Sequence, residues 1–187
     1  AARLNENNWR IFDCRFDLAD TRRGERAYAA GHIPGSFYAH LDRDLAGPIT
    51  PRSGRHPLPE IADMSAWLGA RGVSRDTQVI AYDDTGGTMA VRLWWLLRWL
   101  GHRRVALLDG GIPAWINAGL PLQTEPPPTP RQKKFRAEPD FALVVGNPAK
   151  QIGWACQCGE RLADDLECVA CGKKFEKKHD GLRLVSS

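Results

Sequence analysis

Short apolar runs alternate with longer amphipathic stretches between residues 9 and about 120. The runs have the length and the β-branched or aromatic content of strands, and they are WRIFDCRF, SFYAHL, TQVIAYD and RVALLDGG. The stretches between them predict helices: TRRGERAYAA, LPEIADMSAWLGARG and MAVRLWWLLRWLG. Strands that alternate with helices predict a parallel sheet that is covered by helices on both faces. The predicted fold class is therefore α/β.

The pattern changes at the proline-rich sequence LPLQTEPPPTPRQKK. Residues 123–138 are poor in apolar side chains, which predicts an extended linker. The next stretch, FALVVGNPAKQIGW, is apolar again and has a turn signal at Gly146-Asn147-Pro148. A short region from Trp154 onwards carries four of the five cysteines. We expect a first domain over residues 1–122, then the linker, and a small C-terminal domain over residues 139–187.

Composition and charge narrow the classes of function. Apolar residues make up 43% of the 187 residues and charged residues 26%, as in an ordinary globular protein. The net charge of +4 is spread over interleaved acids and bases, so we do not expect nucleic acid as a partner. The sequence has no apolar run of membrane-spanning length and no signal-peptide pattern, so we expect no membrane partner and a cytoplasmic location.

Four motifs of the α/β region occur in the order that one family shows. They are FDCRFDL, YAAGHIPGSFYAHLD, VIAYDDTGGTMAVRLWWLLRWLGH and LLDGGIPAWINAGLPL. The second motif, Tyr28 to Asp42, resembles the rhodanese signature, in which an aromatic residue precedes His-Ile-Pro-Gly. Together the motifs cover residues 9–122 and resemble the N-terminal, non-catalytic half of two-domain thiosulfate or 3-mercaptopyruvate sulfurtransferases. The resemblance implies a rhodanese-like domain.

The resemblance draws attention to the loop between the third predicted strand and the helix that follows it. Active rhodanese domains carry a cysteine there, and its persulfide is stabilised by backbone N–H groups and a helix N-terminus. In this chain Asp83 and Asp84 occupy the loop, followed by Gly86, Gly87 and Thr88 as the candidate anion loop. A carboxylate cannot form a persulfide. The resemblance therefore implies a degenerate nucleophile position and no catalytic residue in the chain.

Two interpretations of the aspartate pair remain open at this point. In the first, one carboxylate fills the anion site from within, because it carries the charge of a thiolate and accepts the same N–H bonds. The spacing to Gly87 and Ala90 favours Asp84 for this role. In the second, both aspartates belong to a solvated turn that caps the helix.

Other reactive side chains of the first domain are assigned structural roles. Cys14 lies within a strand that we expect to be buried, and Arg15 is its only basic neighbour in the sequence, so an inert thiol is expected. His32, in the sequence HIPG, is expected to fix its loop by hydrogen bonding rather than to act as a base. Residues 109–111, Asp-Gly-Gly, predict a turn with helix capping.

The cysteine-rich tail has the spacing of a metal site. Cys156, Cys158, Cys168 and Cys171 form C-x-C and C-x-x-C pairs, each followed by glycine. Four thiolates predict a structural zinc ribbon with no open position for catalysis. So short a segment has few apolar side chains and needs such a cross-link to fold. The alternative is a redox dithiol at Cys168 and Cys171. His179 is a spare ligand for the zinc ion, relevant only if one of the four cysteines does not bind it.

The tail has a second resemblance. The sequence PDFALVVGNPAKQIGWACQCGERL is similar to the C-terminal end of hexapeptide-repeat sugar N-acyltransferases, some of which append a cysteine ribbon. None of the repeated coils that would build an acyl-CoA site is present, so no catalytic residue is carried over from that family. A natural fusion and a joined product of two genes both remain open.

Three hypotheses of function follow. The first is a non-catalytic or regulatory half of a sulfur-transfer system, with a separate catalytic sulfurtransferase domain or a second copy as partner and a small sulfur-containing anion as ligand. The second is a protein- or anion-binding assembly module that uses the zinc ribbon for association. The third and weakest is a remnant of a sugar N-acyltransferase.

Overall fold

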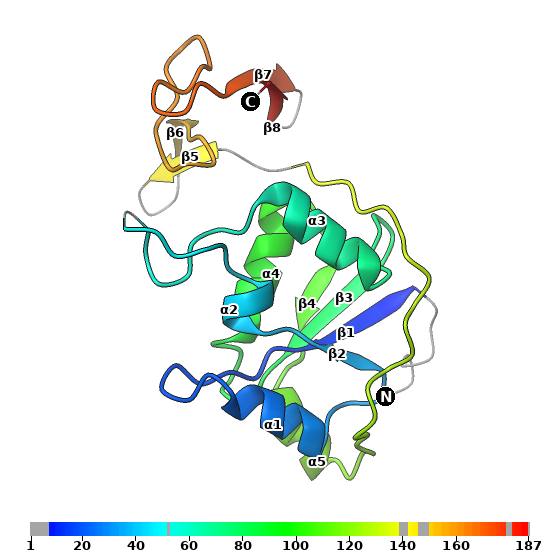
Figure 1. The fold of residues 1–187 in the computed structure, drawn as a ribbon. Helices are drawn as coiled ribbons and strands as arrows, with labels where there is room; N and C mark the ends of the chain where they lie inside the picture. Colours follow the sequence, from blue (N-terminus) through cyan, green and yellow to red (C-terminus); the bar gives the residue numbers. More distant parts are fainter. Residues whose placement is uncertain (1–7, 52, 139–141, 146–149, 179–180, 187) are drawn as a thin grey trace. The chain divides into compact units, whose positions relative to one another are not determined.

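A computed structural model describes residues 8–51, 53–138, 142–145, 150–178 and 181–186 (Figure 1). The chain divides into two compact units. The first holds the described residues up to Arg98 together with His102–Ala137, and the second holds Trp99–Gly101 and the described residues from Glu138 onwards.

The first unit is built on a parallel sheet of four strands, as the alternation of strands and helices predicts. Their order across the sheet is β2-β1-β3-β4. The strands are β1 (Trp9–Asp13), β2 (Ser36–Tyr38), β3 (Gln78–Tyr82) and β4 (Val105–Leu107). In register, Asp13 of β1 pairs with Tyr38 of β2 and with Tyr82 of β3, so the carboxyl ends of three strands meet at one edge.

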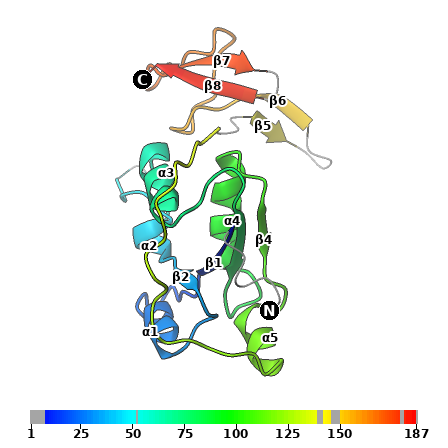
Figure 2. The same ribbon diagram turned by 90° about the vertical axis from the view of Figure 1, so that its right-hand side faces the viewer.

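Five helices cover the sheet on both faces, with α1 and α5 on one side and α2, α3 and α4 on the other (Figures 1 and 2). They are α1 (Arg23–Ala30), α2 (Leu41–Asp44), α3 (Ile61–Ala70), α4 (Ala90–Trp99) and α5 (Gly111–Asn117). The short helix α2 is an addition to the predicted elements, and α5 was indicated only by the helix-capping turn predicted at residues 109–111. The N-cap of α2 is His40, whose ring accepts the N–H groups of Asp42 and Arg43.

Alternate residues of β1 supply the two halves of the core. Ile11 belongs to a buried cluster with Tyr82 of β3 and with Ile112 and Trp115, which bring α5 to that face. Phe12 points the opposite way and its ring lies 5.4 Å from the ring of Trp67 on α3. Full burial of each large apolar side chain stabilises the fold by about 1.5–3 kcal/mol, so the period-two pattern of the strand holds helices on both faces.

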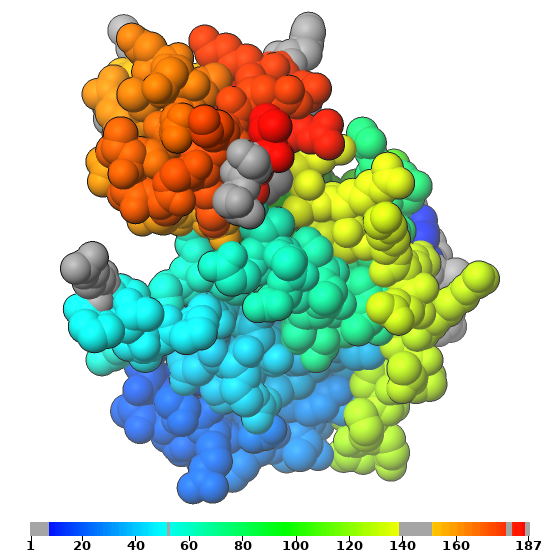
Figure 3. All heavy atoms as spheres, turned by 45° about the horizontal axis from the view of Figure 1, so that its top comes forward, coloured from blue at the N-terminus to red at the C-terminus, as the bar shows by residue number. Residues whose placement is uncertain are grey.

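The proline-rich segment is extended, and it packs along the first unit as a strip (Figure 3). Gln123 and His32 exchange backbone hydrogen bonds at 2.9 Å. The N–H of Lys133 bonds the carbonyl of Gly69 at 3.0 Å, and Phe135 is buried beside His102. Residues 123–137 are thus part of the compact first unit.

The second unit contains two antiparallel hairpins around a small core. The strands are β5 (Ala142–Val145), β6 (Lys150–Trp154), β7 (Lys174–Lys178) and β8 (Gly181–Ser186), paired as β5–β6 and β7–β8. Among the described residues of this unit the buried apolar side chains other than cysteine are few, namely Leu100, Leu162, Phe175 and Leu182. The turn predicted at residues 146–148 and the spare ligand His179 lie outside the described residues. No helix of the described segments has the length and hydropathy needed to cross a membrane.

Candidate functional site

The loop that joins β3 to α4 is organised around the side chain of Asp83. This carboxylate is 1% exposed, although it stands at the end of a strand where a loop meets a helix. Oδ1 accepts the backbone N–H groups of Thr85 at 3.0 Å and Gly87 at 2.8 Å. Oδ2 accepts those of Met89 at 2.8 Å and Ala90 at 2.9 Å. One carboxylate therefore holds four N–H groups that lead into the first turn of α4.

Local sequence explains how the loop can fold around an anion. Gly86 and Gly87 adopt φ values of +72° and +93°, a conformation that costs side-chain-bearing residues strain but glycine little. The N–H groups between them and the helix then converge on one point, as in an anion-binding nest. Burial raises the pKa of Asp83, but the N–H bonds from Ala90, Gly87, Thr85 and Met89 outweigh it and lower that pKa below its ordinary value. The geometry favours a negative charge at this point.

The backbone of Asp83 is fixed as well as its side chain. Its carbonyl accepts the N–H of Ile112, in the first turn of α5, at 3.0 Å. Gly111 comes so close that a Cβ placed on it would lie 2.3 Å from the Asp83 carbonyl oxygen. The Asp-Gly-Gly turn that the sequence indicates therefore brings α5 against the loop, because only glycine fits there.

Asp84 has a different environment. Its Oδ2 pairs with Nη2 of Arg23, at the start of α1, at 2.8 Å, and both side chains are partly exposed. The sequence spacing favoured Asp84 as the carboxylate that fills the anion site, but these N–H groups bond Asp83. Thr88, the third residue of the predicted anion loop, exchanges a 2.7 Å hydroxyl hydrogen bond with Thr85 instead of facing the carboxylate.

A buried polar network beneath the loop was not predicted from the sequence. Asp13, fully buried, is paired with Arg15 at 2.6 Å and accepts the hydroxyl hydrogen of Tyr82 at 2.7 Å. Arg15 also donates to the carbonyl of Gly31 at 2.7 Å, and Tyr82 lies 3.1 Å from the hydroxyl of Ser36. The sequence does contain a signal for this network. Asp13 and Arg15 are two residues apart at the end of a strand, so their side chains lie on the same side of the backbone.

The other reactive side chains of this unit lie apart from solvent. Cys14 is 2% exposed, and burial, followed by the charges of Asp13, Asp83 and Asp44, raises the pKa of its thiol. Such a thiol is a poor nucleophile. His32 is fully buried, stacks on Tyr28 at a ring distance of 3.8 Å, and bonds the Tyr28 carbonyl through Nδ1. The burial and contacts of Cys14 and His32 therefore indicate structural roles for both residues.

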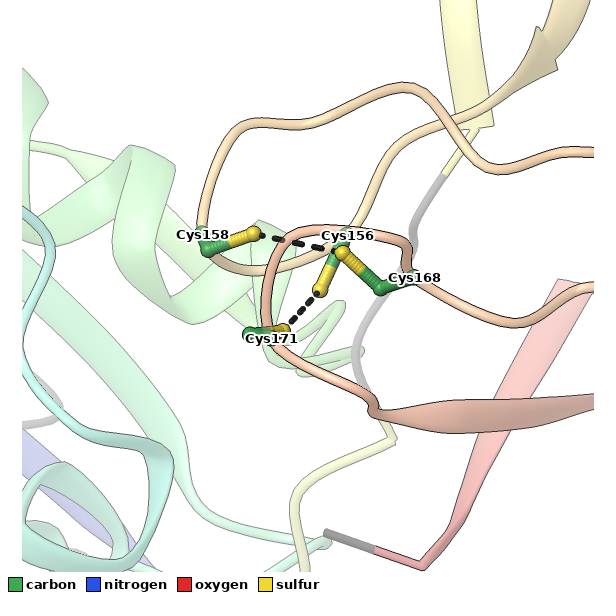
Figure 4. Close-up of side chains that lie close together, drawn as sticks. All are labelled: Cys156, Cys158, Cys168 and Cys171. Carbon is green, nitrogen blue, oxygen red and sulfur yellow. Dashed lines mark hydrogen bonds between the residues drawn. The ribbon is translucent and has the colours of Figure 1, made fainter.

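The second unit brings the four tail cysteines together (Figure 4). Cys156 and Cys158 come from the loop after β6, and Cys168 and Cys171 come from the loop before β7. We call these two loops the first and the second knuckle. All four Sγ atoms lie within 4.8 Å of one another. In each knuckle a glycine N–H closes a turn: Gly159 onto the carbonyl of Cys156 and Gly172 onto that of Cys168.

The donor set fits a tetrahedral soft cation. Zinc–sulfur bonds of about 2.3 Å put tetrahedral sulfurs about 3.8 Å apart, and the observed spacing requires only small shifts to reach this value. Burial raises the pKa of the Cys156 thiol to about 12. At Cys168 the N–H groups of Ala170 and Cys171 and the neighbouring thiols outweigh burial and lower the pKa to about 7. A cation bound by all four sulfurs would bring every one of these cysteines to its thiolate form, since metal binding favours the deprotonated form of each ligand.

The sheet and its strand-to-helix anion loop define the first unit as an α/β domain of the rhodanese type. A family model described as the rhodanese-like domain matches residues 1–118, and the chain belongs to this family. A probable 3-mercaptopyruvate sulfurtransferase of Pseudomonas aeruginosa is 47% identical over 147 residues, which are 78% of this chain and 51% of that protein. The thiosulfate sulfurtransferase of Bos taurus is 35% identical over 139 residues, 72% of this chain and 45% of that protein.

Solved structures agree with these relatives. The 3-mercaptopyruvate sulfurtransferase from Leishmania major is 34% identical with a TM-score of 0.66, and the match covers 73% of this chain and 39% of that one. A 3-mercaptopyruvate sulfotransferase from Escherichia coli is 27% identical with a TM-score of 0.67, covering 77% of this chain and 54% of that one. The chain spans about half the length of the curated relatives it matches. The resemblance of the tail to sugar N-acyltransferases stays a prediction.

Proposed function

We propose that this chain is a non-catalytic or regulatory half of a sulfur-transfer system, in which Asp83 occupies the position of the sulfur-carrying nucleophile. The observation that carries the proposal is the buried Asp83 carboxylate with its four backbone N–H bonds. An anionic persulfide needs the same donors. Asp83 would thus keep the loop in its anion-binding shape. It would also prevent persulfide formation at this position and keep a thiosulfate-like ligand away from the N–H groups.

The surrounding residues support this assignment. The thiol of Cys14, the only cysteine of the first unit, is buried and has a raised pKa, so it offers no substitute nucleophile. His32 has no exposed ring atom to act as a base toward a ligand. The partner that fits a non-catalytic half is a separate catalytic sulfurtransferase domain, or a second copy of this chain.

Restoring a cysteine tests the proposal directly. The Asp83→Cys and Asp84→Cys variants are incubated with thiosulfate, and intact mass measurement looks for the addition of one sulfur atom. We expect added sulfur on Asp83→Cys, since its thiolate would meet the converging N–H groups. The Asp84→Cys variant is the matched control in the same loop, and we expect little or no added sulfur there.

Two results would contradict the proposal. Added sulfur on the unaltered protein that disappears in a Cys14→Ala variant would show that the chain has its own nucleophile. A folded Asp83→Cys variant that takes up no sulfur, beside an Asp84→Cys variant that does, would assign the degenerate position to Asp84. Thermal unfolding of each variant separates these outcomes from simple loss of the fold.

We further propose that the four tail cysteines hold a structural zinc ion. The fit of four sulfurs within 4.8 Å and the small apolar core of this unit support the assignment. The ion would cross-link the two knuckles and supply stability rather than reactivity, because four protein ligands leave no open position. Native mass spectrometry, compared with the denatured mass, tests for one zinc per chain.

A role as an assembly module is the second candidate, and one observation favours it. Val169, at the tip of the second knuckle, is 84% exposed, the highest value among the large apolar side chains of the described residues. A Val169→Glu variant of the full chain would lose association if the ribbon mediates it. Light scattering coupled to size-exclusion chromatography measures the molar mass of each protein. A Val185→Glu variant, altered at another exposed valine, is the control. Equal masses for all three proteins would exclude Val169 from any self-association.

A further inference from the structure

The four clustered cysteines differ in exposure, and the difference follows their contacts. Cys156 and Cys168 are buried, at 4% and 1%, whereas Cys158 and Cys171 are exposed. Two Sγ–Sγ contacts of 3.5 Å are present, one between Cys156 and Cys171 and one between Cys158 and Cys168. Each contact joins the sulfur of an exposed residue to the sulfur of a buried residue. Each also joins the first knuckle to the second (Figure 4).

This arrangement matches the two requirements for disulfide formation by oxidation. The first sulfur must be reachable by the oxidant, because oxidation of thiolates follows their exposure. The second must lie close enough to attack the oxidised sulfur without a large movement of the chain. Cys158 and Cys171 meet the first requirement, and their buried neighbours Cys168 and Cys156 meet the second.

We propose that the cluster is a redox modification site, at which a peroxide-class oxidant attacks Cys158 or Cys171 and the cross-knuckle disulfides Cys156–Cys171 and Cys158–Cys168 form as zinc leaves. The inference rests on the proposed zinc site and extends it, because the same four sulfurs then have two states. In one state a metal ion joins the knuckles, and in the other covalent bonds do.

The chemistry balances with hydrogen peroxide as the only added reagent besides protons. The exposed thiolate attacks one peroxide oxygen, the O–O bond breaks, and the departing hydroxide takes a proton to become water. The sulfenic acid so formed is attacked at sulfur by the buried thiolate, the S–O bond breaks, and a second hydroxide leaves as water. Each disulfide therefore uses one peroxide and two protons, and two thiolates lose one electron each. A zinc ion that has lost two of its four ligands dissociates.

Pairing across the knuckles distinguishes this proposal from the redox dithiol that the sequence left open. A disulfide between Cys168 and Cys171 would lie within the second knuckle and leave the first knuckle unattached. The corresponding bond within the first knuckle would join residues only two apart, which forces the bridge into strained geometry. Disulfides between the knuckles keep the loop after β6 covalently linked to the loop before β7. We therefore expect the hairpin β7–β8 to stay folded after oxidation.

Trypsin separates the two kinds of pairing because of where its sites lie. Cleavage after Lys150, Arg161 and Lys173 yields QIGWACQCGER and LADDLECVACGK, each with one knuckle. The full chain is assayed for zinc, treated with hydrogen peroxide in the presence of a chromogenic zinc chelator, alkylated and digested. We expect release of all bound zinc together with a covalently linked pair of these two peptides.

Fragmentation of the linked peptides from the unaltered chain tests which sulfurs pair, because that chain is oxidised from its folded, metal-bound state. We expect fragments that join Cys156 to Cys171 and Cys158 to Cys168. Fragments that join Cys156 to Cys168, or Cys158 to Cys171, would overturn the proposed pairs.

The outcomes separate this inference from the zinc proposal. Separate peptides after oxidation, with a bond inside LADDLECVACGK, overturn the cross-knuckle pairing. So does full retention of zinc at peroxide levels that oxidise a free cysteine. Absence of zinc before oxidation overturns the zinc proposal alone, and the linked or separate peptides still decide the pairing.

Discussion

The hydroxyl of Tyr82 donates a 2.7 Å hydrogen bond to Oδ2 of Asp13, between the ends of two neighbouring parallel strands. Both side chains are almost fully buried, and Tyr82 is the residue directly before the Asp83 loop. Burial, and next the charge of Asp13, raises the pKa of Tyr82, so its hydroxyl is protonated and available as a donor at neutral pH. The network beneath the loop therefore fixes where the strand ends and the loop begins.

Replacement of Tyr82 by phenylalanine tests this connection. The Tyr82→Phe variant loses a hydrogen bond to a charged acceptor, which we expect to lower the free energy of unfolding by about 1.5–3 kcal/mol. Urea denaturation measures the loss. Tyr28→Phe is the matched control, because the Tyr28 hydroxyl bonds the neutral carbonyl of Ser36 at 2.7 Å, a contact worth about 0.5–1.5 kcal/mol. A larger loss for Tyr28→Phe would contradict the importance of the Asp13 contact.

The second prediction concerns Asp83 and pH. The Asp83→Asn variant keeps the size of the side chain but removes its charge and turns an amide group toward backbone donors. We expect a loss of at least about 2 kcal/mol at neutral pH, because buried N–H groups then lack acceptors. The folded pKa of Asp83 is lowered, so its stabilisation is complete above the unfolded value of about 3.9 and declines as pH falls from there through the folded pKa.

The difference in the free energy of unfolding between the unaltered protein and the Asp83→Asn variant should therefore become smaller as the pH is lowered below about 4. Urea denaturation over a pH series measures it. Asp84→Asn serves as control, since the partly exposed pair with Arg23 contributes about 0–1 kcal/mol. Equal and small losses for the two variants would mean that the Asp83 hydrogen bonds do not stabilise the loop.

The third prediction tests the contact of α5 with the loop. Gly111→Ala would force a Cβ to within 2.3 Å of the Asp83 carbonyl oxygen, at a φ of +56°. We expect about 1–2 kcal/mol of backbone strain and about 1–3 kcal/mol more from overpacking. Gly119→Ala is the control, because its φ is +65° but its Cβ would meet open space. Thermal denaturation should show a clearly larger loss for Gly111→Ala.

The fourth prediction concerns metal removal. Chelation under reducing conditions should unfold the second unit, since its small core is insufficient without a cross-link and metal binding contributes about 10–16 kcal/mol in zinc-finger peptides. Hydrogen exchange measures the effect by segment. Protection should be lost in β7 and β8, while β1 and β3 of the first unit stay protected. Unchanged protection in β7 and β8 would show that the hairpin does not depend on the metal.

Much of the fold follows from local patterns in the sequence. The four strand runs and three helices were predicted because period two and period 3.6 differ over a few residues, and glycine marks two helix ends. The helix α2 was not predicted, because it has only four residues and its cap is a histidine side chain. The packing of the proline-rich segment depends on single contacts, such as that of Phe135, which composition does not reveal.

The sequence singles out the two aspartates of the loop, but it does not show which of them bonds the four backbone N–H groups. Both consecutive aspartates have a glycine three positions later, so spacing alone fits either one. Neighbouring side chains leave the backbone in different directions, and a shift of one residue exchanges the buried one for the exposed one. The Asp13–Arg15–Tyr82 network depends on the register of β1 against β3, which is a tertiary property. The cysteine spacing, in contrast, was sufficient to bring four sulfurs together.

The two oxygens of Asp83 each receive two of the four N–H groups. A thiolate would have to face the same donors with one sulfur atom, and it would have to stay accessible to a sulfur donor. The loop thus supplies its own permanent ligand and needs no substrate to keep its shape. Under the proposed function, the same substitution would have removed the nucleophile and stabilised the loop. A variant with a cysteine restored at this position would then have a less stable domain.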